Sequence, residues 1–343
     1  MGKRNLFFAL SLCLIALLAV GCGGGAPAAN TPAAGQDAAT EPVTIIFAMD
    51  NTTGGPWDLG AKRLMELVEE KAPGRVKFEY YPDGQLSNND QRTTIEMVQT
   101  GSVHLACVLP SIYEQFDQRW QVFSLPYLFS DFETARAACD GEAGQYLMSL
   151  LEEKQLHGLA LWEHGFRHLT TGSKEIHLPG DVAGMKIRVM DSPTFISMFN
   201  LLKAQPTVTS MGELFTALQQ HAVDGQENPL SSIAGRKFNE VQDYLMLSSH
   251  CYAPVILLSN KTFWDGLPED VRQVLNEAAL ESTEYQRQVS EDYETTLKEE
   301  LTQTMTIIEF TPEEIAAWQE AVYPVYDEFR DTIGADICSL FGI

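Results

Sequence analysis

The sequence predicts an α/β protein built from two lobes, and three observations lead to this fold class. Strand-like apolar segments alternate with helical segments over residues 43–109, and the same order returns over residues 185–229. Each half runs strand, helix, strand, helix, strand, which gives parallel sheets with right-handed crossovers. The 343 residues, 45% of them hydrophobic, are enough for one large or two medium domains. Two such lobes predict a cleft between them.

The first half is predicted from segments of different hydrophobic period. Residues 43–49 are apolar and β-branched, as expected of a buried strand, whereas residues 76–81 alternate and predict a strand with two unlike faces. Ala72-Pro73-Gly74 ends the helix between them. The predicted segments are strands 43–49, 76–81 and 103–109 and helices 58–71 and 87–100.

The second half repeats this order after an apolar strand over residues 156–162. Ser210 and Glu213 fit a capping box, in which a hydroxyl and a carboxylate satisfy free backbone N–H groups at the start of a helix. Asp224-Gly225 ends that helix. The other predicted segments are strands 185–190 and 205–208 and a helix over 193–202.

The C-terminal part is predicted to contain one long helix over residues 268–305, with no Gly or Pro after Pro268. A helix of this length could brace both lobes, although two helices with a break remain an alternative. A strand over 306–310 and a helix over 312–332 follow.

The N-terminus has the pattern of an export signal. Lys3 and Arg4 precede an apolar stretch over residues 6–20, which is too short for a typical membrane span of about 20 residues. An uncleaved anchor is the alternative. The junction that ends at Cys22 resembles a bacterial lipoprotein box, so residues 1–22 are expected to be a lipoprotein signal with Cys22 lipidated. Residues 23–42 contain almost no large apolar side chain and predict a flexible tether.

Composition excludes several classes of function. Lys and Arg number 23 against 47 Asp and Glu, a formal net charge of -24, which argues against nucleic-acid binding. The histidines show no metal-ligand spacing, and neither a Gly-x-Ser-x-Gly elbow nor a phosphate-binding Gly-rich loop occurs. We therefore expect no metal, no cofactor and no enzymatic activity.

Four cysteines remain beyond the predicted signal. Sequence cannot choose among their three complete disulfide pairings, and Cys107, in an apolar strand, is expected to be a buried thiol. They are Cys107, Cys139, Cys251 and Cys338.

Candidate ligand-binding residues follow from the rule that ligands bind beyond the carboxyl ends of parallel strands. Arg188 is the most informative, because it lies in a strand otherwise suited to burial and a buried charge needs a partner. Its planar guanidinium matches a carboxylate with two parallel hydrogen bonds. An ion pair inside the protein is the alternative. The same rule selects four places, namely Asp50 with Asn51, Leu109 to Ser111, Arg188 with Asp191, and Asn228.

Further candidates rest on residue chemistry. Arg167 follows the apolar strand 156–162 and is either a ligand-binding residue or a surface arginine. Asn228 offers a donor and an acceptor to a ligand, but Asn-Pro also favours turns, so a purely structural role is the alternative. Trp57, Trp162 and Phe195 could form apolar cleft walls, although aromatic side chains are more often in the core.

Residues 178–229 carry a family resemblance. The segments Gly184-Met185-Lys186-Ile187-Arg188-Val189, Glu213 to Gln219 (ELFTALQ) and Val223 to Pro229 (VDGQENP) are similar to those of solute-binding subunits of tripartite ATP-independent periplasmic (TRAP) transporters. The resemblance extends over residues 43–343. It implies a two-lobed periplasmic-binding-protein-like fold with a hinge and a long bridging helix, and ligand-contacting roles for Arg188, Arg167 and Asn228.

The resemblance also implies an organisation and a function. We expect one lobe from 43–163 with 253–292 and the other from 164–252 with 293–343. The protein would be exported and membrane-anchored, and as a monomer would deliver a small organic acid anion to integral-membrane TRAP subunits. A receptor for a signalling partner is the alternative.

The ligand itself stays open. Asp50 and the loop at Ser111 occupy positions where members of the family place ligand-selective residues. A carboxylate at Asp50 suits the hydroxyls of a sugar acid such as a uronate, but dicarboxylates and keto acids remain alternatives.

Overall fold

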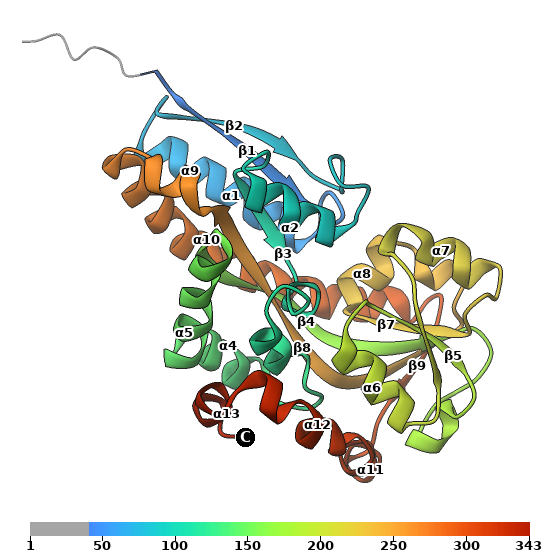
Figure 1. Ribbon diagram of the computed structural model, residues 1–343. Coiled ribbons are helices and arrows are strands. Elements are labelled where there is room, and N and C mark those ends of the chain that lie inside the picture. Colours follow the sequence, from blue (N-terminus) through green and yellow to red (C-terminus); the bar gives the residue numbers. More distant parts are fainter. Residues whose placement is uncertain (1–40) are drawn as a thin grey trace, which may run out of the picture. The chain divides into compact units, whose positions relative to one another are not determined.

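The computed structural model describes residues 41–343, which form one compact unit (Figure 1). The predicted signal peptide, Cys22 and nearly all of the predicted tether lie outside the described residues. No helix in the described part is both long enough and apolar enough to span a membrane.

The described residues form a mixed sheet in the order β2-β1-β3-β8-β4-β7-β5-β6, with β9 paired to β8. β1, β2 and β3 are parallel to one another, as are β5, β6 and β7, so the two repeats predicted from the sequence are confirmed. The strands are β1 (Val43–Met49), β2 (Val76–Tyr81), β3 (Leu105–Val108), β4 (Leu156–Thr171), β5 (Lys186–Val189), β6 (Gln205–Val208), β7 (Gly225–Asn228), β8 (Tyr244–Asn260) and β9 (Thr306–Glu309).

Two long antiparallel strands, β4 and β8, connect the repeats (Figure 1). One end of this pair adds to β3, and the other end adds to β7 and β9. The register between them shifts at three points, including one between Glu163 and Gly165, where Pro254 would otherwise interrupt the ladder. The sequence predicted only the first seven residues of β4 and did not predict β8.

We call β1–β3 with helices α1 (Pro56–Lys71), α2 (Gln91–Thr100) and α3 (Pro110–Tyr113) the first lobe. The second lobe comprises β5–β7 with α6 (Pro193–Leu201), α7 (Met211–Gln219) and α8 (Leu230–Gly235). These core elements agree with the two-lobed prediction, whereas the full boundaries predicted for each lobe remain a prediction.

The predicted long helix is a single helix, α10 (Glu269–Leu301), of 33 residues, so the alternative of two helices is wrong. α10 packs against α1 of the first lobe, α8 of the second lobe and β4 between them. The Gln286 amide on its buried face accepts from the backbone N–H of Glu163 (2.8 Å) and donates to the Glu163 carbonyl (2.6 Å). α10 therefore braces both lobes, as predicted.

Three predicted details are wrong. The helix expected from residue 87 begins at Gln91, because Asp90 caps it by accepting from the Arg92 N–H. Ser210 forms no capping box, since its hydroxyl donates to the Glu213 carboxylate at 2.8 Å instead of accepting from the backbone. The helix expected over 312–332 is broken before Pro324 into α11 (Pro312–Val322) and α12 (Pro324–Ile333).

The remaining helices lie between and after these elements. They are α4 (Phe132–Asp140), α5 (Glu142–Leu150), α9 (Lys261–Gly266) and α13 (Ala335–Phe341), with short 3₁₀ turns η1 (Gln118–Ser124), η2 (Leu151–Lys154), η3 (Pro179–Val182) and η4 (Phe238–Glu240).

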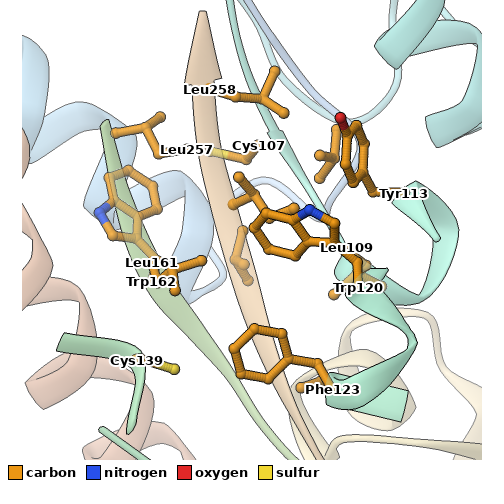
Figure 2. Close-up of a cluster of buried hydrophobic side chains, with 14 of the residues drawn as sticks. Cys107, Leu109, Tyr113, Trp120, Phe123, Cys139, Leu161, Trp162, Leu257 and Leu258 are labelled. Carbon is orange, nitrogen blue, oxygen red and sulfur yellow. The ribbon is translucent and has the colours of Figure 1, made fainter. Parts of the chain in front are cut away.

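Large aromatic side chains fill the core around β3, β4 and β8 (Figure 2). Trp120 and Trp162 are fully buried there. Of the two positions that the sequence allowed for Trp162, the core and the wall of a cleft, the structure shows the core. Cys107 is also buried, as predicted, and all four cysteines of the described part are buried free thiols.

Candidate binding site

A cavity of about 270 Å³ lies between the two lobes. Strand ends build it: Asp50 and Asn51 follow β1, Leu109 follows β3, and Asp191 comes two residues after β5. This is the position that the strand-end rule predicted. The other lining residues lie on strands β4, β5 and β6 (His164, Arg188 and Val208), at or just before the starts of α1, α2 and α7 (Trp57, Asn89, Asp90, Gln91, Arg92, Thr209, Ser210 and Met211), or in and just after β5, α3 and α8 (Met190, Ile112, Gln115, Ser232 and Arg236).

Arg188 contributes a buried cation to this cavity. Its side chain is 2% exposed, and its Nε donates to the Thr209 carbonyl at 2.8 Å. Within residues 41–343 its Nη1 has no hydrogen-bond partner, and the guanidinium forms no ion pair. Burial lowers the pKa of Arg188 to about 10, which still leaves it charged at neutral pH. The guanidinium therefore lacks the internal ion pair that the sequence left open as an alternative.

Arg167, in contrast, is paired inside the protein. Its Nε donates to the Glu227 carboxylate at 2.5 Å, and both side chains are buried. Its Nη2 also donates to Glu227 Oε1 and to Asn228 Oδ1, each at 3.1 Å. Neither Arg167 nor Asn228 lines the 270 Å³ cavity; Arg167 borders a separate space of about 10 Å³, near the minimum for one water.

The buried cluster around Glu227 carries more positive than negative charge. Burial alone would raise the pKa of Glu227, but the Arg167 charge and hydrogen bonds from His250 and Arg167 outweigh it, so Glu227 is ionised. Burial lowers the pKa of His250, which favours the neutral ring. The Arg167 charge adds to the lowering of the Arg188 pKa, while Glu227 opposes it. Glu227 is thus paired with Arg167 alone, and Arg188 is left as a buried positive charge without an ion-pair partner in the described part.

Asp50 contributes a buried carboxylate from the first lobe. It is 6% exposed and accepts hydrogen bonds from the hydroxyls of Ser87 and Thr94. Burial raises the pKa of Asp50, and the two hydroxyls and the Arg236 charge oppose that rise.

Of the other predicted site residues, two line the cavity and one does not. Trp57 lines the cavity, 1% exposed, with its ring edge-on to His164 at a centroid distance of 4.8 Å. Asp191 lines it from an exposed position. Ser111 lies instead beside the small space next to Arg167 and Phe195, with its hydroxyl 3.4 Å from the Met190 sulfur.

Two cavity residues that the sequence did not select join the lobes directly. Gln115 Nε2 of the first lobe donates to the Asp191 carbonyl at 2.6 Å. Arg236, after α8, donates to Asn89 Oδ1 at 2.7 Å and pairs with Asp83 at 3.2 Å. No local pattern marks these residues, because each acts through a partner on the opposite lobe.

No group of three or more His, Cys, Asp or Glu side chains among residues 41–343 is arranged to hold a metal ion. The polar groups of the cavity are instead hydrogen-bonding amides and charged side chains. These suit a small polar organic ligand that is recognised by its own functional groups.

A cavity between two α/β lobes that share long connecting strands, with an unpaired buried cation on its wall, defines a solute-binding protein. Residues 47–332 match the family described as bacterial extracellular solute-binding protein, family 7. The chain belongs to this family, and its predicted resemblance to TRAP solute-binding subunits is confirmed. The family is extracytoplasmic, in agreement with the predicted export.

Three similar proteins illustrate the match. The C4-dicarboxylate-binding periplasmic protein DctP of Rhodobacter capsulatus is 37% identical over 302 residues, covering 87% of this chain and 90% of that protein. A sugar acid binding protein from Advenella mimigardefordensis, in complex with galactonate, has a TM-score of 0.85 at 32% identity, covering 88% of this chain and 97% of that chain. A TRAP periplasmic solute binding protein from Sulfurospirillum deleyianum, with bound succinate, has a TM-score of 0.83 at 32% identity, covering 88% and 99%.

Proposed function

We propose that this protein captures a small organic acid anion in the cavity between its lobes and delivers it to the membrane subunits of a TRAP transporter. The observation that carries this proposal is the buried Arg188 guanidinium, which has no carboxylate partner in the described part of the chain. An unpaired buried charge is destabilising, so a carboxylate from solution supplies the missing partner. Charge-assisted bonds of this kind contribute about 1.5–3 kcal/mol each.

The unbalanced charge behind the cavity supports an anionic ligand. Glu227 pairs with Arg167, which leaves the charge of Arg188 unpaired, so one added carboxylate would neutralise it. We propose that Arg188 contacts the ligand carboxylate directly. Arg167 does not line the cavity, so we propose that it supports the site through its charge, and that Asn228 orients Arg167 by accepting from it.

The ligands of similar proteins support this class of solute. One similar protein holds succinate and another holds galactonate, and the Rhodobacter capsulatus relative is named for C4-dicarboxylates. All of these ligands carry a carboxylate. The common chemistry is therefore the acid group that Arg188 is proposed to bind.

We propose that capture involves closure of the lobes about the β4–β8 pair. The contacts of Gln115 and Arg236 across the cleft would form as the lobes approach. A ligand that touches both lobes favours the closed state and shifts the population toward it. Small-angle scattering should show compaction on saturation, and identical profiles with and without ligand would exclude closure.

We further propose a receptor without turnover, active as a monomer and tethered through a lipid on Cys22. Incubated ligand should be recovered unchanged by mass spectrometry, and light scattering should give the mass of one chain. Labelled palmitate should be incorporated into the wild type in cells but not into a Cys22→Ser variant. Equal labelling of both would remove the anchor from the proposal.

The central test is a thermal-shift screen against organic acids, followed by calorimetry. Binding stabilises the folded state by RT ln(1 + [L]/Kd), about 2.7 kcal/mol at one hundred times Kd. Carboxylates should raise Tm, whereas their uncharged amides should not. If no carboxylate raised Tm, the proposed function would be wrong.

A further inference from the structure

The cavity wall carries two deeply buried charged side chains of opposite sign, one from each lobe. Arg188 of the second lobe is 2% exposed and Asp50 of the first lobe is 6% exposed. The other charged lining groups are more accessible: Arg92 pairs with Glu96 and Arg236 with Asp83, whereas Asp90 and Asp191 are exposed carboxylates without an ion pair in the described part. A ligand inside the cavity therefore meets a cation on one lobe and an anion on the other.

Asp50 has hydrogen-bonding capacity left over. Its two oxygens accept from the hydroxyls of Ser87 and Thr94, whereas an ionised carboxylate offers about four acceptor positions. The residue contributes to the cavity lining, so a ligand donor can occupy a remaining position. A second ligand carboxylate cannot, since it has no proton to donate and would be repelled by Asp50.

Starting from the proposed function, we propose that the acid carries hydroxyl groups and a single carboxylate, as in aldonic and uronic acids, and that Asp50 selects it against dicarboxylates. Arg188 binds the carboxylate at one lobe, and Asp50 accepts from a hydroxyl at the other. The ligand is thereby oriented across the cleft.

Hydroxyls also fit the neighbouring groups better than an ammonium does. A hydroxyl donates and accepts, and so can bond both Asp50 and the amide groups of Asn51, Asn89 or Gln91 on the same wall. An ammonium only donates and would be repelled by Arg236, whose charge acts on Asp50.

Two further polar atoms on lining residues lack a partner. Trp57 Nε1 and His164 Nδ1 are buried, and neither has a hydrogen-bond partner in the described part. Burial lowers the pKa of His164 well below its ordinary value, so the ring is neutral. A neutral imidazole and an indole N–H suit hydroxyl oxygens, whereas they do little to neutralise a second carboxylate.

Calorimetry of the full chain with galactonate and with succinate tests this inference. The wild type should bind galactonate at least tenfold more tightly than succinate. Asp50→Asn should weaken galactonate at least tenfold while leaving succinate unchanged or tighter, because repulsion is removed. Asp265→Asn, an exposed carboxylate on α9, is the matched control and should change neither.

Each other outcome has a definite meaning. Tighter binding of succinate by the wild type, or equal losses for both ligands in Asp50→Asn, would overturn the selection by Asp50 while leaving the proposed function intact. Tighter binding of alanine, which carries an ammonium, would also overturn it. Absence of binding to galactonate, succinate and the rest of the acid library would instead overturn the proposed function.

Discussion

Arg188 Nε lies 2.8 Å from the Thr209 carbonyl oxygen, so the turn before α7 holds the guanidinium by its inner nitrogen. The outer nitrogen Nη1 has no protein partner within the described residues. This arrangement orients a charged group without neutralising it, which is what a site for a transient anion needs.

Replacing Arg188 by Ala should lower affinity for the bound acid at least tenfold, because the charge-assisted bonds are lost. Folding should survive, since no internal ion pair is broken. Calorimetry measures the affinity, and the thermal transition reports folding. Arg63→Ala removes a partly exposed arginine on α1, remote from the cavity lining, and should leave affinity unchanged. Unaltered affinity in Arg188→Ala would remove this residue from the site.

Glu227→Gln should destabilise the protein by about 3–5 kcal/mol, because it leaves Arg167 without its buried partner. Denaturant unfolding measures the change. Glu66→Gln, which breaks an exposed pair with Arg63, is the control and should cost no more than about 1 kcal/mol. Equal losses in the two variants would show that the buried pair contributes no more than a surface pair.

Glu114 should make stability depend on pH. Burial raises its pKa from 4.5 to about 7, against opposing hydrogen bonds from Ser192 and Ser124. Between these values the folded protein keeps a proton that the unfolded chain releases, so its contribution to the free energy of unfolding decreases as pH rises. The loss is about 3 kcal/mol in total and is complete just above pH 7.

Denaturant unfolding of Glu114→Gln between pH 4.5 and 8 measures this contribution. The variant should be less stable than the wild type, or equal to it, at low pH and gain relative stability as pH rises. The exposed Glu313 on α11 provides the control variant Glu313→Gln, whose difference from the wild type should be flat. A flat difference for Glu114→Gln as well would contradict the raised pKa.

Gly60→Val should destabilise the first lobe by about 1–3 kcal/mol through overpacking. A Cβ at Gly60 would lie 2.7 Å from Gln286 Cγ and 3.2 Å from Trp162 Cζ3. Gln286 cannot easily move, because its amide bonds both backbone groups of Glu163. Gly266→Val, where an added Cβ meets nothing within 4 Å, is the control in chemical unfolding. Similar stability of the two variants would mean that this α1–α10 contact is not tightly packed.

The repeated parallel units could be predicted from the sequence because their strands and helices have a clear hydrophobic period and end at recognisable residues, as at Ala72-Pro73-Gly74. Strand β8 could not be predicted in this way. That strand contains His, Cys and Pro254, and Pro ordinarily argues against a central strand. The strand is possible here because the register shifts beside Glu163 accommodate the proline. Pairing of this kind depends on a partner about ninety residues away and leaves no local pattern.

The same distinction holds for the site: residues marked by a local pattern were predicted, and residues that act through distant partners were not. Arg188 was identified because a charge inside an apolar strand is a local anomaly, and Asp50 because it follows a strand end. The pairing of Arg167 with Glu227 could not be inferred, since the two residues are 60 positions apart and meet only through the β4–β7 ladder. Gln115 and Arg236 were missed because their contacts cross the cleft.

The most direct measurement is a crystal structure of the protein with the acid that gives the largest thermal shift. We predict a ligand carboxylate within hydrogen-bonding distance of the outer nitrogens of Arg188, in the cavity between the lobes. A structure in which protein carboxylates alone satisfy Arg188, with the ligand bound elsewhere, would contradict this account.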